Sequence, residues 1–222
     1  MSKILILLTN HGTLAGEANG TYAPELTHAL HAFIEGGYDY DLVSINGGAA
    51  PIYGEDVVDP VNQSILSETS FQKRLASTLA IKDIKAADYC AVFYPGGYGL
   101  LFDLNTDPQA AKITAALYDS GAIVGAVCHG PAGLLPVVLA NGQSILNGKA
   151  VTSFTREEEV AFGTITKIPY VLEESLMDKG ARFTKVKNWG ENLVVDDRLI
   201  TGQNPGSAAV VGKAMVQALK GN

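Results

Sequence analysis

The stretch GAIVGAVCHGPAGLLP, residues 121–136, joins an apolar run to a cysteine, a histidine and a glycine–proline pair. The apolar run predicts a buried strand over 122–128, because strands covered on both faces are continuously hydrophobic. Gly130 and Pro131 predict the start of a helix over about 131–140. Cys128 therefore lies at a sharp strand-to-helix turn. There it is either a core thiol, since cysteine is among the most buried residue types, or a nucleophile held above a sheet.

The rest of the chain alternates strands and helices in the same way. The predicted strands are 3–8, 40–45, 89–95 and 149–154, and the predicted helices are 24–37, 108–119, a segment ending at Gly180, and 206–219. A hairpin is predicted over 192–201, around Asp196 and Asp197. Strands separated by helices favour an α/β fold in which a doubly wound, mostly parallel sheet carries helices on both faces.

Residues 47–87 do not fit a simple crossover between two parallel strands. GGAAPIYGEDVVDP is typical of a loop, and SETSFQKRLASTLAI predicts a helix with a Ser/Thr start. Because the segment is too long for a short connection, we expect an insertion that covers a site. No repeat, low-complexity tract or linker interrupts the chain, so a single domain over 1–222 is expected.

Composition excludes several classes of function. With 18% charged residues, a net charge of −7 and no run of Lys or Arg, the chain lacks the basic surface that nucleic acids require. No segment approaches the roughly 18 apolar residues that cross a bilayer, and the run Ile4 to Leu8 is too short for a secretion signal. We expect a soluble, cytoplasmic protein. Its two cysteines are too few for a disulfide framework, and Cys90, in mid-strand, is predicted to be core.

Several features favour a reactive Cys128. Ligands of doubly wound sheets bind at the carboxyl ends of the strands, and the frame Gly125-x-x-Cys128-x-Gly130 is similar to a nucleophile elbow with cysteine in place of serine. The positive end of the following helix is expected to lower the pKa of the thiol. No histidine follows position 129, so the partner is the adjacent His129 or a histidine far upstream.

The glycine turn YPGGYG lies at the end of another predicted strand. Gly96 and Gly97 let the backbone approach a substrate closely, so their N–H groups, with that of His129, are candidate oxyanion donors. Tyr98 follows them directly.

Two groups of carboxylates lie at the same sheet edge. Glu25 starts the first helix, where it either complements the helix dipole on the surface or faces the site. Of Glu157, Glu158 and Glu159, at most one is expected to face inward. His28 and His31 share a helix flank with glutamates at a spacing that resembles metal ligands, but no second cluster supports this, so no metal site is predicted.

Taken in order, Glu25, YPGGYG, AVCHGPAGL, VTSFTREEE and TGQNPGSA resemble the PfpI/ThiJ superfamily over nearly the whole chain. The resemblance implies its class I glutamine amidotransferase-like, flavodoxin-like fold, an α/β/α sandwich. It also implies roles for single residues. Cys128 corresponds to the elbow nucleophile, His129 to its neighbour, Glu25 to the glutamate that contacts the thiol, Glu159 to the acid that orients the histidine, and Gly97 and His129 to the backbone oxyanion donors.

The closer resemblance is to the glutathione-independent glyoxalase (glyoxalase III) branch, which includes stress-inducible chaperone-type members. It implies conversion of methylglyoxal to lactate through a Cys128 hemithioacetal, without a cofactor, in a homodimer. Protein or nucleotide deglycation is also claimed in this superfamily. Many members of the branch have a histidine where this chain has Tyr98. The alternatives are an amidase or peptidase that uses the same Cys-His-Glu site, and a non-enzymatic holdase chaperone or redox sensor.

Overall fold

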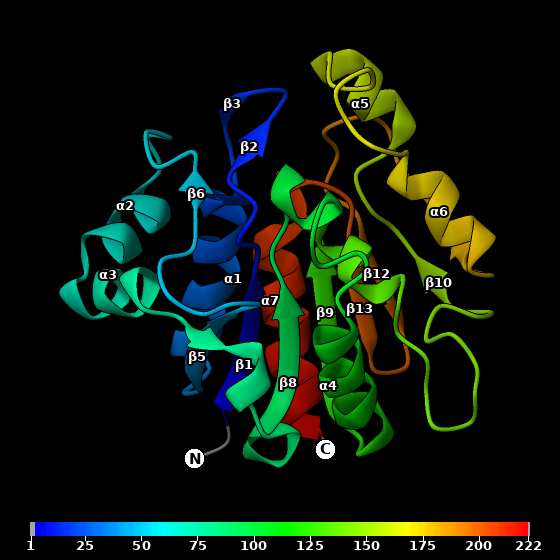
Figure 1. Cartoon of the computed structure of the whole chain (residues 1–222), viewed down its shortest axis with the longest axis horizontal. Helices are drawn as coiled ribbons and strands as arrows, with labels where there is room; N and C mark the ends of the chain where they lie inside the picture. Colours follow the sequence, from blue (N-terminus) through cyan, green and yellow to red (C-terminus); the bar gives the residue numbers. More distant parts are fainter. Residues whose placement is uncertain (1–2, 222) are drawn as a thin grey trace.

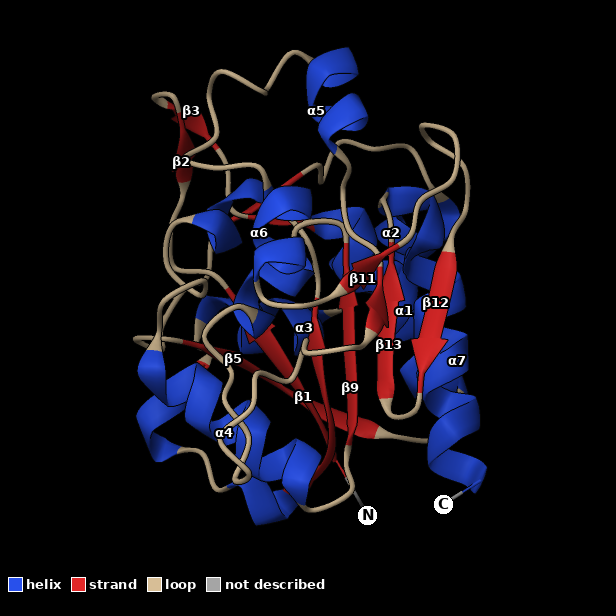
Figure 2. Ribbon diagram, turned by 90° about the vertical axis from the view of Figure 1, so that its right-hand side faces the viewer, coloured by secondary structure: helices blue, strands red, loops and turns tan. Residues whose placement is uncertain are grey.

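A computed structural model describes residues 3–221. Its centre is a seven-stranded sheet in the order β12-β13-β9-β8-β1-β5-β7 (Figures 1 and 2). In chain order these strands are β1 (Lys3–Leu8), β5 (Asp39–Ser44), β7 (Leu79–Ala80), β8 (Tyr89–Tyr94), β9 (Ile123–Val127), β12 (Leu193–Asp196) and β13 (Leu199–Gly202). All neighbours run parallel except β12 and β13, which form the predicted hairpin. The predicted mostly parallel α/β sheet is confirmed.

Helices cover both faces of this sheet. The helices are α1 (Ala23–Glu35), α2 (Pro60–Ser67), α3 (Thr69–Ala76), α4 (Pro108–Asp119), α5 (Arg156–Phe162), α6 (Leu172–Asp178) and α7 (Ala208–Gly221). Buried residues of α1, α2, α3 and α7 share one hydrophobic cluster, and those of α4 and α6 share the other. Among residues 3–221, every helix is too short or too polar to span a bilayer.

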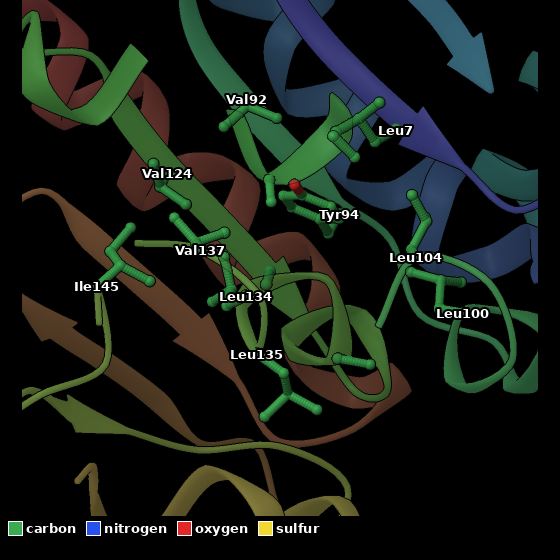
Figure 3. Close-up of a cluster of buried hydrophobic side chains, with 14 of the residues drawn as sticks. Leu7, Val92, Tyr94, Leu100, Leu104, Val124, Leu134, Leu135, Val137 and Ile145 are labelled. Atoms are coloured by element: carbon green, nitrogen blue, oxygen red, sulfur yellow. The ribbon is translucent and has the colours of Figure 1, made fainter. Parts of the chain in front are cut away.

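Strand β1 is continuously apolar because both faces of the sheet are covered at this strand. Ile4 and Ile6 belong to the cluster under α1 and α7, whereas Leu5 and Leu7 belong to the cluster under α4. All four side chains are fully buried, as alternate residues of a strand covered on both faces must be. Figure 3 shows part of the second cluster, with Leu7 near Tyr94.

Short elements complete the fold. Three two-stranded sheets are formed by β2 (Thr13–Leu14) with β3 (Glu17–Ala18), β4 (Thr21–Tyr22) with β6 (Ile52–Tyr53), and β10 (Ala150–Val151) with β11 (Arg182–Phe183). The 3₁₀ turns are η1 (Ile81–Asp83), η2 (Ala86–Asp88), η3 (Tyr98–Leu101), η4 (Gly130–Leu134) and η5 (Pro205–Ser207). In Figures 1 and 2, α5 stands beyond the carboxyl end of β9.

The helix predicted over 131–140 is wrong. The chain forms only the short turn η4 there, because Pro136 has no backbone N–H with which to continue the helical hydrogen bonds. Gly133 also packs on the ring of Tyr94, where a Cβ would lie 2.3 Å from a ring carbon. The strand predicted over 149–154 is likewise reduced to β10, which pairs outside the main sheet.

The segment 47–87 contains more structure than its sequence suggested. Helix α3 lies within the predicted helix, but helix α2 was not predicted. Asp59 caps α2 by accepting the Asn62 backbone N–H at 2.8 Å, and Pro60 is the first residue of the helix. These are ordinary helix-start signals. The segment also supplies the edge strand β7 and, through Tyr53, one wall of the cavity described below.

Candidate active site

Cys128 follows the last residue of β9 in a strained turn. Its φ of 58° lies in the left-handed region, which costs a non-glycine residue about 1–3 kcal/mol and persists only when neighbouring structure enforces it. Here the Cys128 N–H donates to the Gly202 carbonyl at 2.9 Å, and the Phe154 N–H donates to the Cys128 carbonyl at 3.0 Å. The backbone on both sides therefore holds this residue at the bend.

The bend brings two adjacent side chains together. Cys128 Sγ lies 3.3 Å from His129 Nδ1, and His129 Nε2 lies 2.7 Å from Glu159 Oε1. The imidazole and the carboxyl are 2% and 3% exposed. Because a carboxylate accepts the Nε2–H, we assign the tautomer in which Nδ1 presents its lone pair to the thiol. His129 is thus placed as a base for Cys128.

The second oxygen of Glu159 is held by two hydroxyl groups. Thr164 Oγ1 donates to Glu159 Oε2, and the Tyr98 hydroxyl donates to Thr164 Oγ1 at 2.9 Å. The Tyr98 ring also packs against the His129 ring, with centroids 4.3 Å apart. This chain of donors fixes the carboxylate that in turn fixes the imidazole.

Glu25, near the start of α1, is fully buried beside the thiol. Neither of its carboxyl oxygens has a hydrogen-bond partner among the described residues. Burial therefore raises the pKa of Glu25 to about 8. Near neutral pH the group holds a proton that it can readily lose.

The expectation of a lowered thiol pKa is wrong. Burial, followed by the charge of Glu25, raises the pKa of Cys128 well above its usual value. The short turn η4 does not offset this desolvation. The proton of the thiol must therefore pass to a neighbour when the sulfur reacts, and His129 Nδ1 lies at the right place to take it.

The glycine turn lies against these groups because it has no side chains. A Cβ on Gly96 would lie 2.1 Å from Glu25 Oε2 and 2.6 Å from Cys128 Cβ. Gly97 has a φ of 121°, and a Cβ there would lie 2.2 Å from the Gly20 carbonyl oxygen. Within residues 3–221, the backbone N–H groups of Gly97 and His129 donate to no other residue, so both are available to a ligand.

These groups open into a cavity of about 120 Å³. Its lining is largely aromatic: Tyr22, Glu25, Tyr53, Tyr98, Cys128, His129, Phe154, Phe162, Trp189 and Pro205. No group of His, Cys, Asp and Glu side chains suited to a metal ion occurs among residues 3–221. The site offers a thiol, a base and a protonated carboxyl to a small molecule.

Residues 14–218 match the DJ-1/PfpI family. The chain belongs to this family. It is 30% identical to the glutathione-independent glyoxalase HSP31 of Saccharomyces cerevisiae, over 98% of each chain. Among solved structures, it superposes on glyoxalase III of Candida albicans with a TM-score of 0.91 and 27% identity, over 100% of this chain and 98% of the other. The Rapid Encystment Protein of Francisella tularensis gives a TM-score of 0.94 and 31% identity, over 99% of each chain.

The structure brings Glu25 and His129 to the Cys128 sulfur and places Glu159 behind His129. The expectation that at most one glutamate of 157–159 faces inward is wrong, because Glu158 and Glu159 are both buried. Glu157 is exposed and pairs with Lys185. Glu158 closes a capping box with Thr155 at the start of α5.

The other residues singled out in the sequence lie away from this site. His28 pairs with Asp59 at 2.9 Å and His31 with Glu35 at 3.4 Å. Cys90 is only partly buried, with Sγ 3.4 Å from the Lys3 carbonyl oxygen, because β8 begins at the rim of the sheet. It packs against the cluster under α1 and α7 without being fully buried.

Sequence reasoning missed Thr164 and the aromatic walls. Thr164 follows Gly163, which ends α5 with a left-handed φ of 78°, so the turn folds the hydroxyl back onto Glu159. The glycine at position 163 indicates the end of a helix, but nothing in the sequence indicates that the Thr164 hydroxyl contacts Glu159.

Replacing Gly96 by alanine is expected to lower kcat/KM at least about a hundredfold. The new methyl group would displace Glu25 and Cys128, and a misplacement of about 1 Å at a catalytic group costs roughly that factor. The matched control is Gly221→Ala, since nothing lies within 4 Å of a Cβ there. Steady-state kinetics checks this, and a Gly96→Ala enzyme as active as the control would contradict the close packing described here.

Replacing Tyr98 by phenylalanine is expected to reduce kcat only severalfold. The hydroxyl acts through Thr164 and Glu159, and one such hydrogen bond contributes about 1 kcal/mol. Tyr170→Phe is the control, because its buried hydroxyl has no partner among residues 3–221 and lines a different cavity. A thousandfold loss in Tyr98→Phe would show instead that the hydroxyl contacts the reacting atoms.

Proposed function

We propose that this protein is a glutathione-independent glyoxalase that converts methylglyoxal to lactate. The proposal rests on the position of the Cys128 sulfur, which lies between the lone pair of His129 Nδ1 and the buried carboxyl of Glu25. The kinship with glyoxalases over the full chain supports the same reaction. A covalent thiol adduct makes a thiol cofactor such as glutathione unnecessary.

The first step forms a bond between sulfur and carbon. His129 Nδ1 takes the thiol proton while Sγ of Cys128 adds to the aldehyde carbon, which gives a hemithioacetal. The free N–H groups of Gly97 and His129 are proposed to hold the oxygen on which negative charge develops. Glu159 stabilises the imidazolium formed in this step through its contact with Nε2.

The second step moves a proton from the aldehyde carbon to the neighbouring carbonyl carbon. Glu25, as the carboxylate, removes the proton from the first carbon while the oxygen on the second carbon takes up a proton, which gives an enediol. Glu25 then returns its proton to the second carbon as the hydroxyl on the first carbon loses its proton and becomes the thioester carbonyl. A carboxyl whose pKa is about 8 is a stronger base than an ordinary glutamate and still exchanges its proton near neutral pH. The product is a lactoyl thioester on Cys128.

The last step regenerates the enzyme. Water adds to the thioester carbonyl, the carbon–sulfur bond breaks, and lactate leaves while His129 returns the proton to sulfur. The same oxyanion donors serve this addition. Atoms balance as methylglyoxal plus water giving lactic acid.

The direct experiment supplies methylglyoxal to the purified protein with no added thiol and measures lactate. We expect catalytic lactate formation at a rate unaffected by glutathione. A requirement for glutathione, or the absence of lactate, would overturn the proposal. The homodimer, the cytoplasmic location and the single domain stay predictions, and size-exclusion chromatography with light scattering tests the first of them.

A further inference from the structure

The cavity beside the Cys128 sulfur is lined mainly by aromatic side chains. Its volume of about 120 Å³ is roughly four times the ~30 Å³ that one water occupies in the liquid. Methylglyoxal has five non-hydrogen atoms, so a larger substituent would extend to the exposed aromatic side chains at the edge of the cavity. Glu25 and His129 are the acidic and basic residues of this lining, and most of the other lining residues are aromatic.

Two of these aromatic side chains are exposed at the mouth. Trp189 is 51% and Phe162 63% exposed, and their ring centroids lie 6.1 Å apart. The Trp189 ring also lies 5.8 Å from that of Phe154, deeper in the cavity. Exposed apolar groups beside a pocket are typical of a surface that a ligand covers.

The backbone of Trp189 is held in place by a buried carboxylate. Trp189 has a φ of 65°, a strained conformation for a bulky residue. Its N–H donates to Glu158 Oε1 at 2.9 Å, and the same oxygen accepts from Asn204 Nδ2 at 2.8 Å. Glu158 therefore ties Trp189 to the loop that carries Pro205, another lining residue.

We propose that Trp189 and Phe162 make this enzyme selective for 2-oxoaldehydes whose substituent is neutral, apolar and larger than methyl, an aromatic ring above all. The inference rests on the proposed function. With Cys128 joined to the aldehyde carbon, the substituent extends among the aromatic rings, where it buries apolar surface and packs against Trp189. Phenylglyoxal plus water would give mandelic acid by the same steps.

The kinetic test compares two substrates, phenylglyoxal and methylglyoxal, in wild type and in Trp189→Ala. The ratio of their kcat/KM values is expected to fall about tenfold in the variant, since a lost aromatic contact is worth that factor. The intrinsic reactivity of each aldehyde is the same for both proteins, so it cancels when the ratio in the variant is divided by the ratio in wild type. The loss is expected mainly in KM for phenylglyoxal. Ile34→Ala, an exposed apolar residue of α1, is the control.

Phe162→Ala keeps the test decisive if Trp189→Ala fails to fold, because Phe162 is an exposed residue at the end of α5. The ratio should fall in this variant as well. Equal losses on both substrates would overturn the inference and leave the proposed function intact. No turnover of either aldehyde by the folded wild type would overturn both.

A binding measurement separates the two claims further. Trp189 is the single tryptophan of the chain, so its fluorescence reports occupation of this wall directly. Mandelate is expected to change that fluorescence with a Kd about tenfold lower than that of lactate. Equal affinities, or no fluorescence change at saturating mandelate, would contradict an aromatic-substituent site even in an active glyoxalase.

Discussion

Cys128→Ser is expected to lower kcat/KM for methylglyoxal by at least about a thousandfold, because loss of an acting nucleophile removes the whole covalent route. Serine fits the same turn and the same volume. Its hydroxyl is a far weaker nucleophile, however, and His129 Nδ1 must remove a much less acidic proton. Lactate formation without added thiol measures the effect.

Cys90→Ser is the matched control for this substitution. Cys90 lies at the start of β8, and burial raises the pKa of its thiol as well, but it has no imidazole or carboxyl beside it among the contacts described. Wild-type rates are expected for Cys90→Ser. Activity that survives in Cys128→Ser and is lost in Cys90→Ser would reverse the assignment of the nucleophile.

Glu25→Gln is expected to lower kcat by about 10²–10⁴, the usual contribution of a general acid–base group. Glutamine keeps the shape of the side chain but cannot carry a proton between the two substrate carbons. Glu35→Gln on the same helix is the control, because that side chain is 64% exposed. Unchanged kcat in Glu25→Gln would remove Glu25 from the mechanism.

The same substitution has a pH-dependent effect on stability. The pKa of Glu25 is about 8 in the folded protein, against an ordinary glutamate value of 4.5. Between these values the unfolded chain releases a proton that the folded protein retains, so this group lowers the free energy of unfolding as pH rises. Below the unfolded pKa the group is protonated in both states and its effect vanishes.

Urea unfolding at several pH values checks the sign. The stability of Glu25→Gln relative to wild type is expected to rise from about pH 4.5 to about pH 8, by about 1.4 kcal/mol per pH unit. A pH-independent cost of burying the amide shifts the whole curve without changing this slope. A difference that stays flat, or that falls with pH, would mean that Glu25 is ionised in the folded protein.

Long elements of the fold could be predicted because their signals are local. The run Ile4 to Leu8 is apolar on both faces, and α4 begins at an Asp107 cap followed by Pro108. The edge strand β7 has only two residues, too few for any periodic pattern, and its place depends on β5. The apolar run over 131–140 favoured a helix, but Pro136 stops it after the short turn η4.

The site was predictable where its chemistry lies in adjacent residues. Cys128 and His129 stand together in the sequence, and the small residues around them indicate a tight turn. The choice of Glu159 among three glutamates came from the family resemblance, since helix periodicity alone did not separate it from Glu158. Contacts such as Trp189 to Glu158 join segments far apart in the chain, and no local pattern encodes them.

The deciding measurement follows the sulfur of Cys128 during turnover. The enzyme is quenched in acid while it converts methylglyoxal, and its cysteine peptides are analysed by mass spectrometry. We predict a lactoyl group on the peptide that carries Cys128 and none on the peptide that carries Cys90. Rapid lactate formation with Cys128 unmodified at every time point, or with equal modification of both cysteines, would contradict covalent catalysis at the elbow.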